Sequence, residues 1–223
     1  MSRRLRTLGV LELIERLEKH SRQRLPRNDV QLVDGRPLVV GGNSKDRDTQ
    51  KGYAAGQWQR GYKLHLICNR RGVVNAWHVT PMRHNEPKAA SLMIDHTPPG
   101  GWFLADGMYD CNALYEQAAE RGSRWIAMPR NRKAKGLSHR RHHRDRVDAW
   151  PYVRTDAGQG LMKRHRIRIE QINAWQGHAD IGLGALPHHV RRIRRVRLWV
   201  ALKIVIYHHW LSEKYNAKKT ALA

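Results

Sequence analysis

Apolar residues recur along the chain with two different periods, and the change of period marks where elements begin and end. Residues 4–20 predict an amphipathic helix that the segment holding Pro26 ends. Its apolar face comprises Leu5, Leu8, Leu11, Ile14 and Leu17. Further helices are predicted at 84–96, 111–122, 161–175 and 190–211. The last of these has one apolar face and one basic face.

Short apolar runs between turn residues predict strands. They lie at 30–33, 62–69, 73–80, 102–105 and 124–128. The Asn-Arg-Arg-Gly turn at 69–72 joins two of them as an antiparallel hairpin, and a Gly-rich polar stretch at 41–61 is typical of a loop. These strands and helices predict an α/β fold with a mixed sheet flanked by helices.

The domain organisation follows from the same pattern. We expect a short N-terminal helical segment over residues 1–29, one main domain over 30–212 and a tail over 213–223. The main domain contains a strongly cationic segment near 131–160, which we expect to be a loop or an insertion. No internal repeat or convincing linker divides it.

Charge indicates a polyanionic partner. The chain has 223 residues, 42 Lys+Arg against 19 Asp+Glu and a formal net charge of +23, so nucleic acid is the default partner. A basic structural protein such as a ribosomal protein is the weaker alternative. Such a protein needs positive charge, and charge alone does not account for 8 Trp residues or for aspartates at strand ends. Cys68 and Cys111 give no disulfide framework, and the apolar run at 196–207 is broken by Arg197 and Lys203. We therefore expect a cytoplasmic protein without a membrane span.

Three carboxylates stand where chemistry is expected. Asp34 follows the first strand, Asp106 follows a central strand in a strand–helix–strand unit, and Glu170 lies on a late helix. Open α/β sheets place their chemistry at such strand ends. Acidic clusters of this kind hold two metal ions in polynucleotide cleavage, and Mg²⁺ needs only two or three carboxylates per site.

Each of these residues also has a plainer interpretation. Asp34 before Gly35 is a common turn pair, and Glu170 forms a surface i,i+4 pair with Arg166. Other acidic residues are expected to be solvated loop residues, or in one case a helix N-cap. The solvated set is Asp46, Asp48, Asp145, Asp148 and Asp156, and the N-cap is Asp110.

The remaining polar and aromatic candidates concern nucleic acid. The 14 His residues lack zinc-finger spacing and a nearby Cys pair, so we assign no structural metal. Trp58 and Trp175 are candidates for base stacking, with packing as the commoner role. The arginines at the start of the last helix, together with Lys63 and Arg166, are the candidate DNA contacts. Those arginines are Arg191, Arg192, Arg194, Arg195 and Arg197.

Several motifs carry a resemblance to a known family. They are Val33-Asp34-Gly35, Ser-Lys-Asp at 44–46, Gly-Tyr-Lys-Leu-His-Leu at 61–66, Val-Thr-Pro-Met-Arg-His-Asn-Glu at 79–86, Leu-Ala-Asp-Gly-Met-Tyr-Asp at 104–110 and the Arg166/Glu170 pair. In this order they resemble the catalytic domain of bacterial insertion-sequence transposases of the DDE type, which share an RNase H-like fold. The resemblance implies that Asp34, Asp106 and Glu170 are the metal-binding catalytic triad.

The resemblance also implies an activity and its partners. The activity is Mg²⁺-dependent cleavage and strand transfer of DNA, in which Mn²⁺ can substitute for Mg²⁺. The partners are the element's terminal inverted repeats and the target DNA. The resemblance also implies that the protein binds DNA as a homodimer in the cytoplasm of a bacterium, near the nucleoid. The sequence departs from the family pattern at Lys163, where Tyr is usual, and at Gly177, where Lys is usual. Only 33 residues precede Asp34, from which we expect a compact or shortened member. The alternative is a decayed transposase that only binds DNA.

Overall fold

The computed structural model describes residues 7–54, 56–130, 136–184 and 186–220. Within them a single six-stranded sheet runs in the order β2-β3-β1-β5-β6, with β4 on the same edge of β3 as β2. The strands are β1 (Val30–Val39), β2 (Gln50–Ala54), β3 (Gln57–Asn69), β4 (Val74–Pro81), β5 (Gly101–Ala105) and β6 (Ser123–Ala127). The mixed sheet that the sequence predicts is therefore confirmed.

The sheet has an antiparallel half and a parallel half, and β1 belongs to both. On one side β1 pairs antiparallel with β3 over residues 31–39, and on the other side it pairs parallel with β5 only over residues 30–33. β6 continues the parallel half beyond β5. β1 thus leaves the parallel half after Val33, while its antiparallel pairing continues for six more residues.

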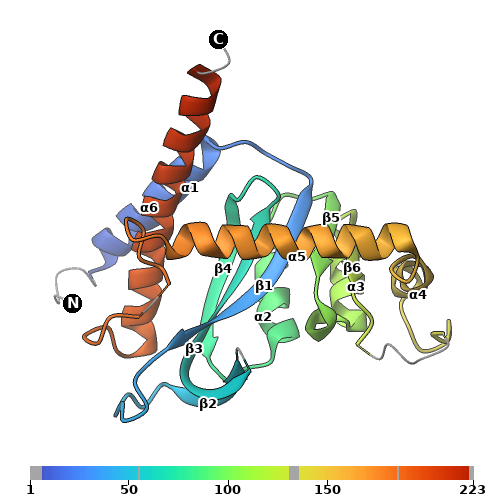
Figure 1. Cartoon of the computed structure of the whole chain (residues 1–223), viewed down its shortest axis with the longest axis horizontal. Helices are drawn as coiled ribbons and strands as arrows, with labels where there is room; N and C mark the ends of the chain where they lie inside the picture. Colours follow the sequence, from blue (N-terminus) through green and yellow to red (C-terminus); the bar gives the residue numbers. More distant parts are fainter. Residues whose placement is uncertain (1–6, 55, 131–135, 185, 221–223) are drawn as a thin grey trace.

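Helices cover both faces of the sheet (Figure 1). α2 (Glu86–Ile94) and α3 (Asn112–Glu120) pack on one face, where Phe103 stacks on Trp125. α5 (Asp156–Gly177) crosses the other face, with Ile169 and Ile172 buried against it. The remaining helices are α1 (Leu8–Gln23), α4 (Arg144–Tyr152) and α6 (Ile193–Thr220).

Two sequence predictions are wrong, one about where a strand ends and one about a loop. The first strand does not end before Asp34, because pairing with β3 carries it on to Val39. The stretch 41–61 contains β2 and the start of β3, which pair with each other as a hairpin. The insertion near 131–160 contains α4 and the first turn of α5; residues 131–135 lie outside the described residues.

The polar loop after β1 caps a distant helix instead of being solvated. Asp46 is buried and accepts hydrogen bonds from the Tyr62 hydroxyl at 2.6 Å and the Arg192 backbone N–H at 2.9 Å. Asp48 accepts from the backbone N–H of Ile193 at 2.9 Å. Burial alone would raise the Asp46 pKa, but these hydrogen bonds bring it below its ordinary value. The two carboxylates therefore satisfy backbone donors at the start of α6.

Asp110 is not the N-cap of the α3 helix, since Cys111 occupies that position. Its nearly buried carboxylate instead binds the Arg146 guanidinium, with Nε at 2.8 Å from one oxygen and a terminal nitrogen at 3.1 Å from the other. This two-point contact ties α4 to the segment that precedes α3. No described helix has the length and apolarity that a membrane span requires.

Candidate active site

Two strands of the parallel half bring Asp34 and Asp106 together. Val33 is paired with Ala105 in parallel register, so the next residue of each strand carries a carboxylate at the same edge. Asn173 of α5 donates to the Asp34 carboxylate at 2.9 Å. The Asp106 carboxylate accepts from the Met108 backbone N–H at 2.8 Å and caps the short 3-10 turn Gly107–Tyr109. Both side chains are thereby held in place.

The α5 helix adds Glu170 to the same cavity. A cavity of about 610 Å³ is lined by Asp34, Asp106 and Glu170 together with Lys163 and Arg166. Thr155 caps the helix by accepting from the Gly158 N–H. A Cβ at Gly158 would lie 2.0 Å from the carbonyl oxygen of Tyr152, so this turn requires glycine.

Glu170 differs from the two aspartates in its surroundings. Its side chain is 60% exposed and pairs with Arg166, whose Nε lies 3.0 Å from a carboxylate oxygen. The i,i+4 contact that the sequence suggested is present, and exposed pairs of this kind contribute little to stability. Glu170 therefore stands on the rim of the cavity, held by a weak contact.

Burial and neighbouring negative charges make the aspartates reluctant to ionise. Burial raises the Asp34 pKa to about 6 against the lowering by Asn173, with a smaller contribution from Asp106. Burial also raises the Asp106 pKa, while the charges of Lys63 and Arg166 lower it. A desolvated carboxylate pair of this kind is stabilised by a bound cation.

A buried ion pair near the aspartates was missed by sequence reasoning. Lys63 on β3 pairs with Glu86 at the start of α2, and both side chains are largely buried. The Glu86 charge contributes to raising the pKa of Asp34 and of Asp106. The only signal in the sequence was that both residues lie inside motifs of the resemblance. Lys63 was predicted as a DNA contact, and its largely buried ion pair leaves little of it exposed to phosphate.

His165 was also missed, and no sequence signal pointed to it. It lines the cavity from α5, is only 6% exposed, and its Nε2 has no hydrogen-bond partner among the described residues. Burial lowers its pKa to about 4, so the ring is neutral at neutral pH.

The predicted arginine face is divided between a loop and a helix. Arg191 and Arg192 precede α6, where Arg191 donates to the carbonyls of Pro187 and Val190 and Arg192 pairs with Asp48. The other three lie in the first turns of α6: Arg194, Arg195 and Arg197. Their role as DNA contacts remains a prediction.

The two tryptophan candidates lie in different environments. Trp58 is 73% exposed on the β2–β3 hairpin, edge-to-face with Tyr53. Trp175 is half-buried beside Trp210, with the Arg168 guanidinium 4.6 Å from its ring centre. Trp175 therefore has a packing role, while Trp58 is accessible.

The donor set fits a divalent cation in part. Asp34 and Asp106 offer adjacent, desolvated carboxylate oxygens, which suit Mg²⁺ or Mn²⁺. Across the described ranges, however, no group of three His, Cys, Asp or Glu side chains lies close enough to hold a metal ion. The aspartate pair is thus a preformed half-site, and Glu170 shares its cavity without joining it.

Comparisons with known proteins agree with this architecture. The family described as "Transposase DDE domain" matches residues 26–208. No curated protein matches the chain in sequence. A solved structure, the cryo-EM structure of a piggyBac transposase synaptic complex with hairpin DNA, is similar with a TM-score of 0.63 at 9% identity. The match covers 96% of this chain and 53% of that one, so the chain spans about half the length of its structural relative. The predicted RNase H-like fold is confirmed.

Proposed function

The chain belongs to the transposase DDE domain family, and we propose that it catalyses metal-dependent cleavage and strand transfer of DNA. The observation that carries this proposal is the convergence of Asp34, Asp106 and Glu170, from three separate elements, on one cavity. A protein that only binds a polyanion gains nothing from three carboxylates on a surface of this charge.

The proposed reaction has two phosphodiester steps. In the first, a water oxygen attacks phosphorus at the end of the element, and the bond to the 3′-oxygen breaks to leave a free 3′-hydroxyl. In the second, that hydroxyl attacks a phosphodiester of the target, and the target's own 3′-oxygen leaves. One P–O bond forms and one breaks in each step, so no protein nucleophile or external energy source is required.

The carboxylates have distinct roles in this proposal. Asp34 and Asp106 would hold Mg²⁺ or Mn²⁺, and Glu170 would complete the site on leaving Arg166. Bound metal would supply a more acidic attacking water and a counter-charge for the leaving oxygen. Arg166, released from Glu170, would be free to contact a phosphate at the rim.

The finer assignments rest on the family resemblance and the net charge. We propose that the element is a bacterial insertion sequence, that the partners are its terminal inverted repeats and target DNA, and that the chain acts as a homodimer in the nucleoid region of the cytoplasm. The arginines of the α6 region, Arg191, Arg192, Arg194 and Arg195, are proposed contacts to the DNA backbone. The net charge of +23 supports such contacts.

One observation favours a second candidate, a transposase-derived protein that binds DNA without cleaving it. Glu170 is held by Arg166, and the described carboxylates do not assemble into a three-ligand site. Lys163 and Gly177 also depart from the family pattern around this glutamate. The two candidates differ only in whether DNA brings Glu170 to the aspartates.

Nicking and strand-transfer assays with Mg²⁺ or Mn²⁺ separate the two candidates. The substrate is a duplex carrying the element's own end, and the enzymes are wild type, Asp106→Ala and Glu170→Ala at matched DNA binding. Activity in wild type that both variants lose supports the transposase. Wild type that binds the duplex and cleaves it with neither metal supports the binding-only protein.

A further inference from the structure

A second cavity lies on the face of the parallel strands that α5 crosses. It has a volume of about 710 Å³ and is lined by Val30 of β1, by Trp102 and Leu104 of β5, by β6, by α4 and by Leu161 of α5. The carboxylate cavity is lined instead by the residues that follow Val33 and Ala105, and by Met162 of α5. The two cavities share no lining residue, and consecutive residues of α5 separate them.

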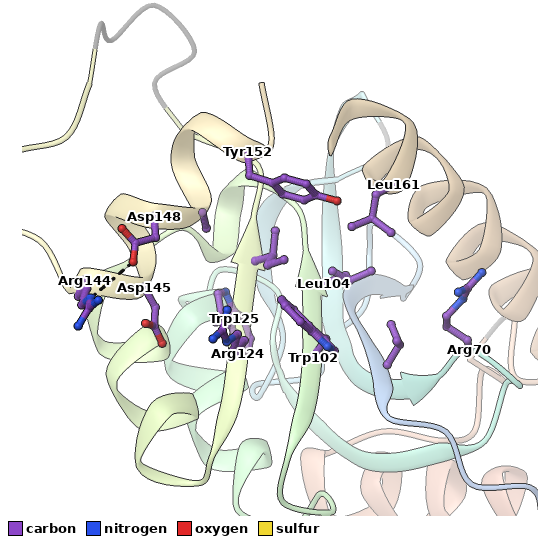
Figure 2. A pocket seen from close by; sticks show the side chains of 13 residues that line it. Arg70, Trp102, Leu104, Arg124, Trp125, Arg144, Asp145, Asp148, Tyr152 and Leu161 are labelled. Atoms are coloured by element: carbon purple, nitrogen blue, oxygen red, sulfur yellow. Dashed lines mark ion pairs between the residues drawn. The ribbon is translucent and has the colours of Figure 1, made fainter. Parts of the chain in front are cut away.

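Aromatic and apolar side chains form much of this second cavity. Leu104 and Ile126 are buried in the sheet beneath it. Trp102 and Tyr152 are 41% and 43% exposed, so each presents part of its ring to solvent. Figure 2 shows Trp102 on β5 and Tyr152 at the end of α4, with Leu104 and Leu161 also facing the cavity.

Arginines surround the same opening. Arg70, Arg124 and Arg144 line it and are all exposed (Figure 2). Arg124 lies 5.4 Å from the Trp102 ring centre, which orients the guanidinium beside an aromatic face. Among the residues described, the Arg70 and Arg124 guanidinium groups have no hydrogen-bond or ion-pair partner, and Arg144 makes only an exposed 3.7 Å contact with Asp148. Two cationic groups are therefore available to a ligand.

We propose that this cavity binds an unpaired segment of DNA, with a base against Trp102 or Tyr152 and its flanking phosphates on Arg70 and Arg124. Exposed aromatic rings next to unpaired arginines are what single-stranded nucleic acid requires, because bases stack on the rings and phosphates pair with the cations. A duplex presents its bases inside the stack and cannot use the rings.

Charge and shape together favour this ligand over a protein segment. Asp145 and Asp148 lie on the α4 side, while Arg70 and Arg124 lie on the β3 and β6 sides, so the positive potential is concentrated away from α4. The excess of 42 Lys+Arg over 19 Asp+Glu in the whole chain adds to that potential. An acidic peptide could pair with the arginines, but it would leave the two rings without a stacking partner.

The inference rests on the proposed function only in taking DNA as the partner. Strand cleavage next to the carboxylate cavity frees strand ends, and frayed nucleotides need a place outside the reacting site. The second cavity supplies such a place without touching Asp34, Asp106 or Glu170.

The test is fluorescence anisotropy in EDTA, with a short fluorescein-labelled oligothymidylate and a blunt duplex of equal length as probes. Trp102→Ala and Tyr152→Ala are each expected to weaken single-strand binding about fivefold or more, which is the loss of one base–aromatic stack. Duplex affinity is expected to change by less than about twofold, since the duplex does not use the rings. No cleavage is needed, so failure here is distinguishable from failure of the proposed activity.

Paired variants keep the test decisive. Trp102→Phe retains an aromatic ring and should keep most of the affinity, whereas Trp102→Leu retains apolar surface only and should lose it. Arg70→Gln and Arg124→Gln should each reduce the salt dependence of single-strand binding by about one released ion. Arg47 is an exposed arginine outside the cavity, and Arg47→Gln should lower the affinity for both probes equally. Thermal unfolding of each variant verifies that it is folded.

Four results would overturn the proposal. The first is wild-type binding of the oligothymidylate by Trp102→Ala and Tyr152→Ala. The second is a loss of affinity in Trp102→Phe as large as that in Trp102→Leu. Equal losses for single strand and duplex would indicate a general charge effect. A change of oligomeric state in sedimentation, with single-strand affinity unchanged, would make the cavity a contact between copies of the chain.

Discussion

The two sides of the carboxylate cavity are built differently. On the sheet side, Asp34 and Asp106 extend from neighbouring strands, are desolvated and accept hydrogen bonds from Asn173 and Met108. On the helix side, Glu170 is exposed, and among the described residues its partner is Arg166. The sheet side is therefore organised in advance of any ligand, whereas the helix side has to rearrange to take part.

The largest effect is expected on the sheet side. Asp34→Asn or Asp106→Asn removes a charge that is proposed to hold the metal ion, and we expect DNA cleavage to fall by at least about a thousandfold, equivalent to the several kcal/mol that metal catalysis supplies. Asp95→Asn is the control, because Asp95 is exposed, pairs with Arg121 and lies outside the carboxylate cavity. Single-turnover cleavage of a duplex that carries the element's end measures the rate for the two site variants and for the control. Cleavage by either site variant at the rate of the control would exclude its aspartate from the site.

The buried pair near the aspartates is expected to matter for stability. Lys63→Met leaves the Glu86 carboxylate buried without its cation, which should lower the free energy of unfolding by about 3–5 kcal/mol. The double variant Lys63→Met/Glu86→Gln removes both charges and should recover much of that loss. Urea unfolding at neutral pH measures each. If the double variant is no more stable than the single one, charge burial is not the cause.

Buried histidines make the fold sensitive to acid. Burial lowers the pKa of His65 and of His208 to about 3, below the ordinary value of 6.5. Between these values the unfolded chain binds protons that the folded chain does not, so stability is complete above about pH 6.5 and is lost as the pH falls. In that window each of the two histidines should lower the free energy of unfolding by about 1.4 kcal/mol for each unit that the pH falls.

His208→Gln checks this assignment. Its free energy of unfolding is lower at neutral pH, because the His208 Nε2 accepts from the Val74 backbone N–H at 3.1 Å, but its slope between pH 6 and pH 4 should be shallower by one proton. Equal slopes in wild type and variant would show that other groups cause the acid loss.

The smallest effect is expected for the helix side. Arg166→Ala breaks the contact with Glu170, and because both groups are exposed the free energy of unfolding should change by less than about 0.5 kcal/mol. Arg146→Met is the contrasting variant, since it leaves the nearly buried Asp110 carboxylate unpaired and should cost several times more. Thermal unfolding compares the two. A similar cost for both would mean that the rim is as tightly organised as the core.

Local sequence patterns predicted the parts of this fold that depend on neighbouring residues. The parallel strands, the hairpin at 69–72 and the placement of Asp106 followed from apolar runs and turn residues. The true length of β1 did not, because Asp34-Gly35-Arg36-Pro37 has turn chemistry that pairing with β3 overrides. Tertiary contacts therefore decided where the strand ends.

Contacts between distant residues were beyond local patterns. Asp46 and Asp48 cap a helix that begins at Ile193, and nothing near either carboxylate indicates that partner. The Lys63–Glu86 pair depends on how α2 packs, and His165 is buried by the crossing of α5 over the sheet. Glu170 was assigned by resemblance alone; its place in the cavity became visible only with the path of α5.

Metal binding without DNA tests the contrast between the two sides most directly. Mn²⁺ titration followed by electron paramagnetic resonance would compare wild type with Asp34→Asn, Asp106→Asn and Glu170→Gln. We predict that wild type and Glu170→Gln bind Mn²⁺ with similar affinity and that either aspartate variant loses the binding. Equal loss in Glu170→Gln, or binding that survives in both aspartate variants, would contradict a half-site preformed by the sheet.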